Sequence, residues 1–170
     1  VLALCTLALA AGIFYVTLYH TSRAAAASQR QLPIYSVECK NRLCAISFDA
    51  AWGNEDTQLL IDILAKYNVK TTFFVVGDWV DKYPESVKAL HDAGHEVMSH
   101  SNHHDHYNSL SSSQIISDIK ASCDKIEAVT GRCPTLIRCP YGEYDDHVIS
   151  AIRSMGMEPI QWDVERPATA

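Results

Sequence analysis

The chain has 170 residues, of which 48% are hydrophobic and 20% charged, and its formal net charge is -6. A chain of this length and composition can form one globular domain with a sizeable core. The negative charge and the lack of any basic cluster argue against nucleic acid as a partner.

The N-terminal segment is almost wholly apolar, and its first 19 residues carry no charge. A helix of about 20 residues spans the roughly 30 Å hydrocarbon core of a membrane, so we expect residues 1–22 to be a transmembrane anchor or a signal segment. The small residues at 24–27 could mark a cleavage site, but the long apolar run favours an uncleaved anchor. We therefore predict a single-pass protein of the cell membrane, with a linker over residues 23–36 and an extracytoplasmic domain over residues 37–170.

Strand and helix patterns alternate beyond the linker. Runs of apolar and β-branched residues predict strands over residues 43–48, 70–76, 95–99, 135–138 and 157–163. Apolar residues at helical spacing predict helices over residues 54–67, 85–92 and 146–155. A further helix begins after Ser111, which forms a capping-box pattern with Gln114, and ends at Gly131. Repeated strand and helix units imply a parallel α/β sheet, either open or closed.

The first predicted strand ends in a motif with a carboxylate, because Asp49 is followed by Ala50, Ala51, Trp52 and Gly53. An acid at the carboxyl end of a buried strand stands where parallel α/β folds place their chemistry. The alternative is that Asp49 caps the helix predicted to begin at residue 54.

Two histidines follow the third predicted strand, at positions 100 and 104. On a single helical turn His100 and His104 would share one face and could bind one small divalent cation. The alternative is a solvated loop that is simply rich in histidine, because the same region also holds His91, His95, His103 and His106.

The fourth predicted strand ends at Arg138, and Cys139, Pro140, Tyr141 and Gly142 follow it. A strand that ends in a charge and leads into a turn of proline, an aromatic residue and glycine is a third candidate site motif. An ordinary connection from strand to helix would use proline and glycine equally well.

These three motifs, in this order and with these gaps, resemble the first three motifs of the polysaccharide deacetylase family, which is carbohydrate esterase family 4 or the NodB homology domain. The resemblance covers about residues 32–163, and residues 47–56 are similar in particular to the sporulation-type, membrane-anchored members. It implies a distorted, incomplete (β/α) barrel with all three motifs at the C-terminal rim. The implied activity is the removal of N-acetyl groups from polysaccharide such as peptidoglycan or spore cortex.

The resemblance also implies roles for single residues. Asp49 is the expected general base, oriented by Arg138, and the main-chain N–H of Tyr141 is expected to complete an oxyanion site. His100 and His104 are the expected ligands of a divalent metal, zinc or cobalt. Trp52, Pro140 and Tyr141 are expected to contact the glycan, although Trp52 could equally be a core aromatic residue.

The chain departs from the family at Ala50, where the usual first motif has a second aspartate that ligates the metal. The site therefore lacks one expected ligand, unless Glu55, Asp56 or His103 replaces it. The fourth motif begins at residues 162–164, but residues 165–170 do not continue it. We accordingly expect a C-terminally truncated domain that is poorly folded and weakly active.

Two alternatives to the deacetylase remain open from the sequence. A non-catalytic protein that binds or assembles cell-wall glycan would explain Ala50, whereas the retained Asp49 and Arg138 favour the enzyme. A hydrolase of small amides on the same scaffold is the other alternative. The six cysteines do not contain a Cys-x-x-Cys pattern, and free thiols are favoured over a single optional bridge between Cys39 and Cys44.

Overall fold

The computed structural model describes residues 11–16, 30–41 and 43–164, and the chain divides into two compact units, Val1–Arg30 and Gln31–Ala170. In the first unit, residues 11–16 are helical and exposed. Within the described ranges, no helix is both long enough and apolar enough to span a membrane. Most of the predicted anchor over residues 1–22 lies outside the described residues, so the anchor stays a prediction.

The second unit contains a parallel five-stranded sheet whose spatial order follows the order of the chain. Its strands are β1 (Ser47–Ala50), β2 (Thr72–Val75), β3 (Glu96–Ser99), β4 (Leu136–Ile137) and β5 (Glu158–Pro159). The prediction of a parallel α/β sheet is thus confirmed, and the fold is consistent with a distorted, incomplete barrel. Part of the predicted linker belongs to this unit, because Ile34 forms a parallel bridge with Ile160 beyond β5.

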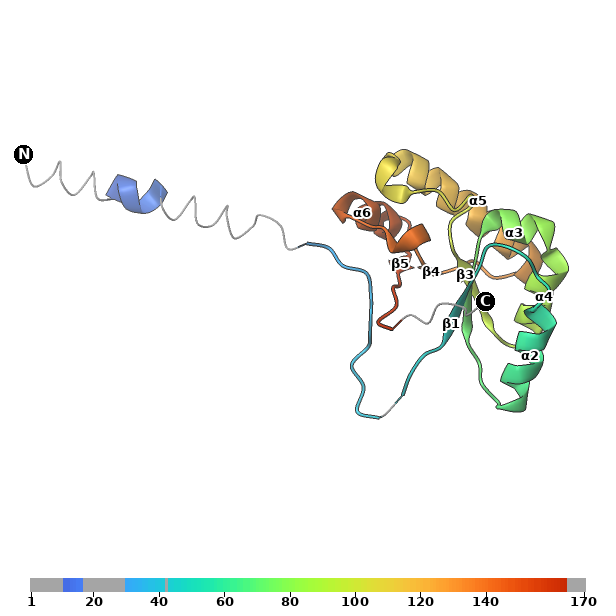
Figure 1. The fold of residues 1–170 in the computed structure, drawn as a ribbon. Helices are drawn as coiled ribbons and strands as arrows, with labels where there is room; N and C mark the ends of the chain where they lie inside the picture. Colours follow the sequence, from blue (N-terminus) through green and yellow to red (C-terminus); the bar gives the residue numbers. More distant parts are fainter. Residues whose placement is uncertain (1–10, 17–29, 42, 165–170) are drawn as a thin grey trace, which may run out of the picture. The chain divides into compact units, whose positions relative to one another are not determined.

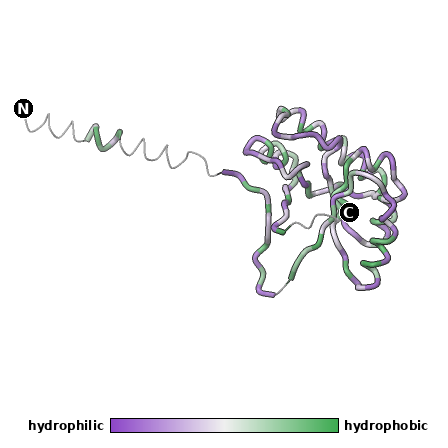
Figure 2. The backbone as a smooth tube through the Cα atoms, in the orientation of Figure 1, coloured by the Kyte–Doolittle hydropathy of each residue, from purple (hydrophilic) through white to green (hydrophobic). Residues whose placement is uncertain are grey.

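Five helices follow one another around one side of the sheet (Figure 1). They are α2 (Thr57–Lys66), α3 (Gly77–Lys82), α4 (Pro84–Asp92), α5 (Ser112–Thr130) and α6 (Asp146–Ser154), and the turns η1 (Tyr107–Ser109) and η2 (Pro140–Gly142) are 3₁₀ helices. Apolar and polar residues alternate along these helices (Figure 2), as expected for helices with one buried face.

The core consists of two apolar clusters. One joins β2 and β3 to the helices α2, α3 and α4, and it includes Phe73, Val75, Trp79, Val87 and Leu90. The other joins α5 and α6 to β4, and it includes Tyr107, Ile115, Ile119, Ile137 and Ile152. The clusters hold the helices against the sheet and so fix the positions of the strand ends.

Helix α5 begins and ends as its sequence predicts. The Ser111 side chain accepts a hydrogen bond from the N–H of Gln114, and the Gln114 side chain accepts one from the N–H of Ser111, which is a complete capping box. Gly131 has a left-handed backbone with φ of 69° and stops the helix.

Several predicted boundaries were wrong. The first strand begins at Ser47 rather than residue 43, and it is not buried: the residues before it are exposed, Leu43 by 74% and Ile46 by 46%. The reason is that β1 lies at the edge of the described sheet, with β2 as its neighbour there. Helix α3 was not predicted, because its six residues are too short to show a helical period.

Candidate active site

The three motifs come together at the end of the sheet where the strands have their carboxyl termini. Asp49 lies in β1, His100 directly follows β3, and Arg138 directly follows β4. In a parallel sheet all carboxyl ends point the same way, so side chains from separate strands can meet there. The structure therefore brings together the predicted base, a predicted metal ligand and the predicted orienting arginine.

Arg138 and Asp49 form a charge pair across the sheet. One guanidinium nitrogen of Arg138, Nη1, donates to Oδ1 of Asp49 at 2.6 Å, and Nη2 donates to the hydroxyl of Ser47 at 2.8 Å. The guanidinium carbon lies 4.2 Å from the centre of the Phe74 ring in β2. Arg138 is only 4% exposed, so these contacts fix its side chain, and such charge-assisted bonds are strong.

Asp49 does not cap a helix, because the N-cap residue of α2 is Asp56. The Asp49 side chain is 34% exposed, and its second oxygen, Oδ2, lies 3.8 Å from Nε2 of His100. The carboxylate is therefore held on one oxygen by Arg138, while about a third of the side chain is exposed to solvent. Ser47 and Phe74, which position Arg138, were not predicted from the sequence, since no local pattern distinguishes them from ordinary strand residues.

His100 is buried, with 3% exposure, and its ring is oriented by a main-chain bond. Nδ1 lies 2.8 Å from the carbonyl oxygen of Arg138. Because a carbonyl can only accept, Nδ1 carries the proton and Nε2 keeps a free electron pair. Burial lowers the pKa of His100 from its usual value of 6.5, so the ring is held neutral, as a metal ligand must be.

His104 reaches the site from a loop, so the prediction of one helical turn carrying both histidines was wrong. Ser101 and His104 have left-handed backbones, with φ of 71° and 60°, and residues 100–104 form no helix. The two rings nevertheless converge, with centroids 4.9 Å apart. Burial lowers the pKa of His104 as well, and within the described chain its buried Nδ1 has no hydrogen-bond partner.

Two neutral imidazoles with unused nitrogen atoms are suitable donors for a divalent metal. A third donor is not in place, because Ala50 supplies none, and no group of three or more His, Cys, Asp or Glu residues able to hold a metal occurs among the described residues. Glu55 accepts a hydrogen bond from the N–H of Asn54, and His103 is bonded to Asp78. The residues present thus fit a metal held by two protein ligands, one fewer than catalytic zinc usually has.

Two exposed aromatic side chains flank His104. Trp52 is 79% exposed and Tyr141 is 54% exposed, so the alternative that Trp52 is a core residue was wrong. Their ring centroids lie 5.1 Å and 4.6 Å from that of His104. A groove of about 340 Å³ lies beside them, lined by both rings, His104 and part of α3. Exposed aromatic faces of this kind can stack on a sugar ring.

The turn after β4 has a constrained backbone. Tyr141 has φ of 58° and Gly142 has φ of 67°. A side-chain carbon at Gly142 would approach Gln161 and Trp162 within 2.8 Å and 2.9 Å, which explains the glycine. Pro140 is buried, so it can shape this turn but presents little surface to a glycan. The five cysteines that the structure describes, 39, 44, 123, 133 and 139, are free, so the optional bridge is not formed.

The fold and this arrangement define an α/β protein whose site lies at the carboxyl ends of parallel strands, with an acid and arginine pair beside two neutral histidines. Residues 36–160 match the family model described as polysaccharide deacetylase. The chain belongs to this family.

Related proteins include deacetylases of different glycans. The chain is 35% identical to the peptidoglycan-N-acetylmuramic acid deacetylase PdaC of Bacillus subtilis over 76% of its own length and 27% of the relative's. It is 34% identical to chitin deacetylase 1 of Cryptococcus neoformans, over 74% of its length and 27% of the relative's. The chain thus spans about a quarter of these curated relatives.

Solved structures of relatives include one described as a pseudoenzyme and one described as a peptidoglycan deacetylase. A family 4 pseudoenzyme from Bacillus anthracis is 32% identical with a TM-score of 0.74, covering 77% of this chain and 47% of the other. The structure of PdaC from Bacillus subtilis is 35% identical with a TM-score of 0.67, covering 75% of this chain and 62% of the other.

Proposed function

We propose that the chain is a hydrolase that removes N-acetyl groups from polysaccharide, with peptidoglycan, including its spore-cortex form, as the substrate class. The observation that carries the proposal is the pair of Asp49 and Arg138, held at 2.6 Å beside His100. A protein that only binds glycan does not need an oriented, solvent-open carboxylate. Relatives described as peptidoglycan deacetylases support the choice of substrate.

The residues of the chain divide the work as follows. Asp49 accepts a proton from the attacking water on Oδ2, because Arg138 occupies Oδ1. The main-chain N–H of Tyr141 stabilises the negative oxygen that develops on the acetamide. Trp52 and Tyr141 hold the sugar ring beside His104. A divalent metal, zinc or cobalt, held by His100 and His104 would polarise the acetamide and lower the pKa of bound water.

Asp49→Asn tests this proposal, because it keeps the shape of the side chain and removes the base. Acetate release from peptidoglycan fragments, chitin oligomers and small acetamides would be measured for the wild type and the variant. We expect turnover only with the wild type and only on glycans. Asp62→Asn is the matched control, since this exposed acid on α2 bonds only to Gln58 in the described structure. Turnover by Asp49→Asn near the wild-type level would remove Asp49 from the mechanism.

A second candidate is a non-catalytic protein that binds or assembles cell-wall glycan, and Ala50 is the observation that favours it. The similarity to the Bacillus anthracis pseudoenzyme supports this candidate as well. Retained glycan binding without acetate release, lost in Trp52→Ala, would support the binding protein. Equal release of acetate from small acetamides and from glycans would instead support a hydrolase of small amides.

For the location, we propose that residues 1–22 anchor the protein in the cell membrane and that the domain is extracytoplasmic. The uncharged N-terminal run supports the anchor, and a cell-wall substrate lies outside the membrane. The similarity of residues 47–56 to sporulation-type members supports a role in spore formation. Protease added to intact cells should digest the domain if this location is right, and protection from protease would contradict it.

A further inference from the structure

The loop from Ser101 to Tyr107 carries His104 in a conformation that it would not adopt by itself. Ser101 and His104 both have left-handed backbones, a region that residues other than glycine rarely occupy. Such conformations are costly and persist only where surrounding contacts fix them. The contacts around this loop therefore decide where the His104 ring lies.

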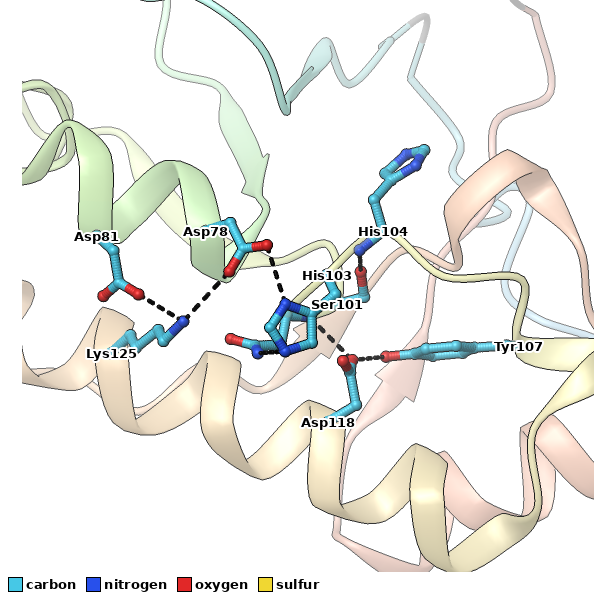
Figure 3. A network of polar contacts seen from close by, with 9 residues as sticks. Asp78, Asp81, Ser101, His103, His104, Tyr107, Asp118 and Lys125 are labelled. Carbon is cyan, nitrogen blue, oxygen red and sulfur yellow. Dashed lines mark hydrogen bonds and ion pairs between the residues drawn. The ribbon is translucent and has the colours of Figure 1, made fainter.

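Asp118 of α5 holds both ends of this loop (Figure 3). Its Oδ2 accepts a hydrogen bond from the main-chain N–H of Asn102 at 2.8 Å and one from the hydroxyl of Tyr107 at 2.7 Å. Tyr107 is fully buried, Asn102 is 4% exposed and Asp118 is half-buried, so water has limited access to these bonds. One carboxylate oxygen thus ties the start and the end of the loop to one point on a rigid helix.

The link from Asp118 to His104 is short. Asn102 follows Ser101, whose hydroxyl accepts a hydrogen bond from the main-chain N–H of His104 at 2.9 Å. Fixing the N–H of Asn102 therefore fixes the residue that orients His104. The carbonyls of Ser101 and Asn102 are held in turn by the N–H groups of Gly77 and Asp78, each at 3.0 Å.

A carboxylate at the position of Asp118 lowers the stability of the fold unless its contacts offset the cost. It lies on α5 between the buried residues Ile115, Ile119 and Ser122, and in the described structure its other oxygen, Oδ1, is buried without a partner. An unpaired buried oxygen of a carboxylate lowers stability. The two bonds to the loop are the contacts that offset this cost.

We propose that Asp118 is a positioning residue of the site, acting on His104 through the backbone of the loop from Ser101 to Tyr107. This proposal rests on the proposed function only in one respect, namely that His104 acts as a metal ligand. The surface contacts of His103 with Asp78, and of Lys125 with Asp78 and Asp81, lie on the outside of the same network. His103, Asp78 and Asp81 are exposed, so water screens these contacts, and they contribute less than the part-buried bonds of Asp118.

The test compares Asp118→Ala, Asp118→Asn and the control Asp124→Ala in the full chain. Asp124 lies on the same helix but is exposed and pairs with Lys120. Amide hydrogen exchange is measured without metal at His104 and at Val75, which lies in the neighbouring strand β2. Loss of the loop anchor should speed exchange at His104 by about 10-fold relative to Val75 in Asp118→Ala. The change should be smaller in Asp118→Asn, because its amide oxygen still accepts.

A second measurement is zinc affinity, which we expect Asp118→Ala to weaken by about 10-fold and Asp124→Ala to leave unchanged. The same substitution in a His104→Ala background should have no further effect on affinity. If Asp118→Ala does not fold, the ratio of exchange at His104 to exchange at Val75 in Asp118→Asn tests the proposal instead. An unchanged ratio in the folded variants would overturn the proposal. A wild type without zinc affinity would count against the metal site instead, while the exchange result would still decide the role of Asp118.

Discussion

The main-chain carbonyl of Arg138 accepts a hydrogen bond from Nδ1 of His100 at 2.8 Å, so the residue that orients the proposed base also orients a proposed metal ligand. The two functions use different parts of Arg138, because Asp49 is held by the guanidinium. A substitution of the side chain can therefore remove the contact with Asp49 and leave the contact with His100 in place.

Arg138→Met should lower acetate release strongly and leave zinc content nearly unchanged. It should also reduce the free energy of unfolding by about 1 to 3 kcal/mol, because Asp49 loses its cation but remains partly solvated. Urea denaturation, elemental analysis and the acetate assay check the three effects. Zinc loss in the folded variant would show that the guanidinium, too, is needed to hold the metal ligands.

The histidine pair predicts about one zinc or cobalt ion per chain, bound by His100 and His104. Replacing both with alanine should remove the metal, because the two substitutions remove both proposed ligands. Elemental analysis after dialysis checks this, with His91→Ala as the control. Equal metal content in the double variant and the wild type would show that the site lies elsewhere.

Ala50→Asp should tighten zinc binding, since it supplies the carboxylate that the first motif of the family usually has at this position. It should also cost stability, because Ala50 packs against the apolar cluster of β2 and α4. Zinc titration and urea denaturation separate these effects, with Ala50→Asn as the control for size. No gain in affinity would indicate that another residue already completes the set of ligands.

His95 predicts a dependence of stability on pH. It is 5% exposed, its Nδ1 accepts a hydrogen bond from the N–H of Thr71 at 3.4 Å, and burial, followed by the nearby Lys70, lowers its pKa from 6.5. The unfolded chain therefore binds more protons than the folded one as the pH falls below 6.5, and the fold loses stability there, whereas above 6.5 this contribution is constant.

His95→Asn keeps an acceptor near Thr71 but does not titrate. The fall in the free energy of unfolding between about pH 7.5 and about pH 5.5 should be smaller than in the wild type. Urea denaturation at both pH values checks this. An equal fall in both proteins would assign the pH dependence to other groups.

The capping box predicts that removing its serine at the start of α5 lowers the stability of the fold. Ser111→Ala should reduce the free energy of unfolding by about 1 kcal/mol, because the N–H of Gln114 loses its acceptor. Ser112→Ala, one position further into the helix, should change it little. Equal effects of the two substitutions would contradict a specific capping role for Ser111.

The sequence predicted the order of the elements because periodicity and helix caps are local signals. Ser111, Gln114 and Gly131 define α5 in the structure as they do in the sequence. The exposure of Leu43 and Ile46 could not be predicted in this way. An apolar run indicates a strand, but whether the strand lies at the centre or the edge depends on its neighbours.

The sequence predicted which residues lie at the site but not the backbone conformation and the contacts that place them there. The spacing of His100 and His104 suggested a helical turn, and the left-handed backbone of Ser101 and His104 depends on contacts from distant parts of the chain. Asp118 could have been noticed as an acid within the buried stripe of a predicted helix. Its partner, the N–H of Asn102, leaves no trace in the sequence.

The pair of Asp49 and Arg138 joins residues 89 positions apart, across a sheet whose strands follow the order of the chain. Contacts of such long range form slowly, because the intervening chain must first be ordered. During synthesis the strand with Asp49 leaves the ribosome well before Arg138. The Asp49 carboxylate therefore stays unpaired with Arg138 until β4 has joined the sheet. The formation of the pair should therefore mark a late step of folding, and a chain arrested before β4 would contain Asp49 and both histidines without an oriented base.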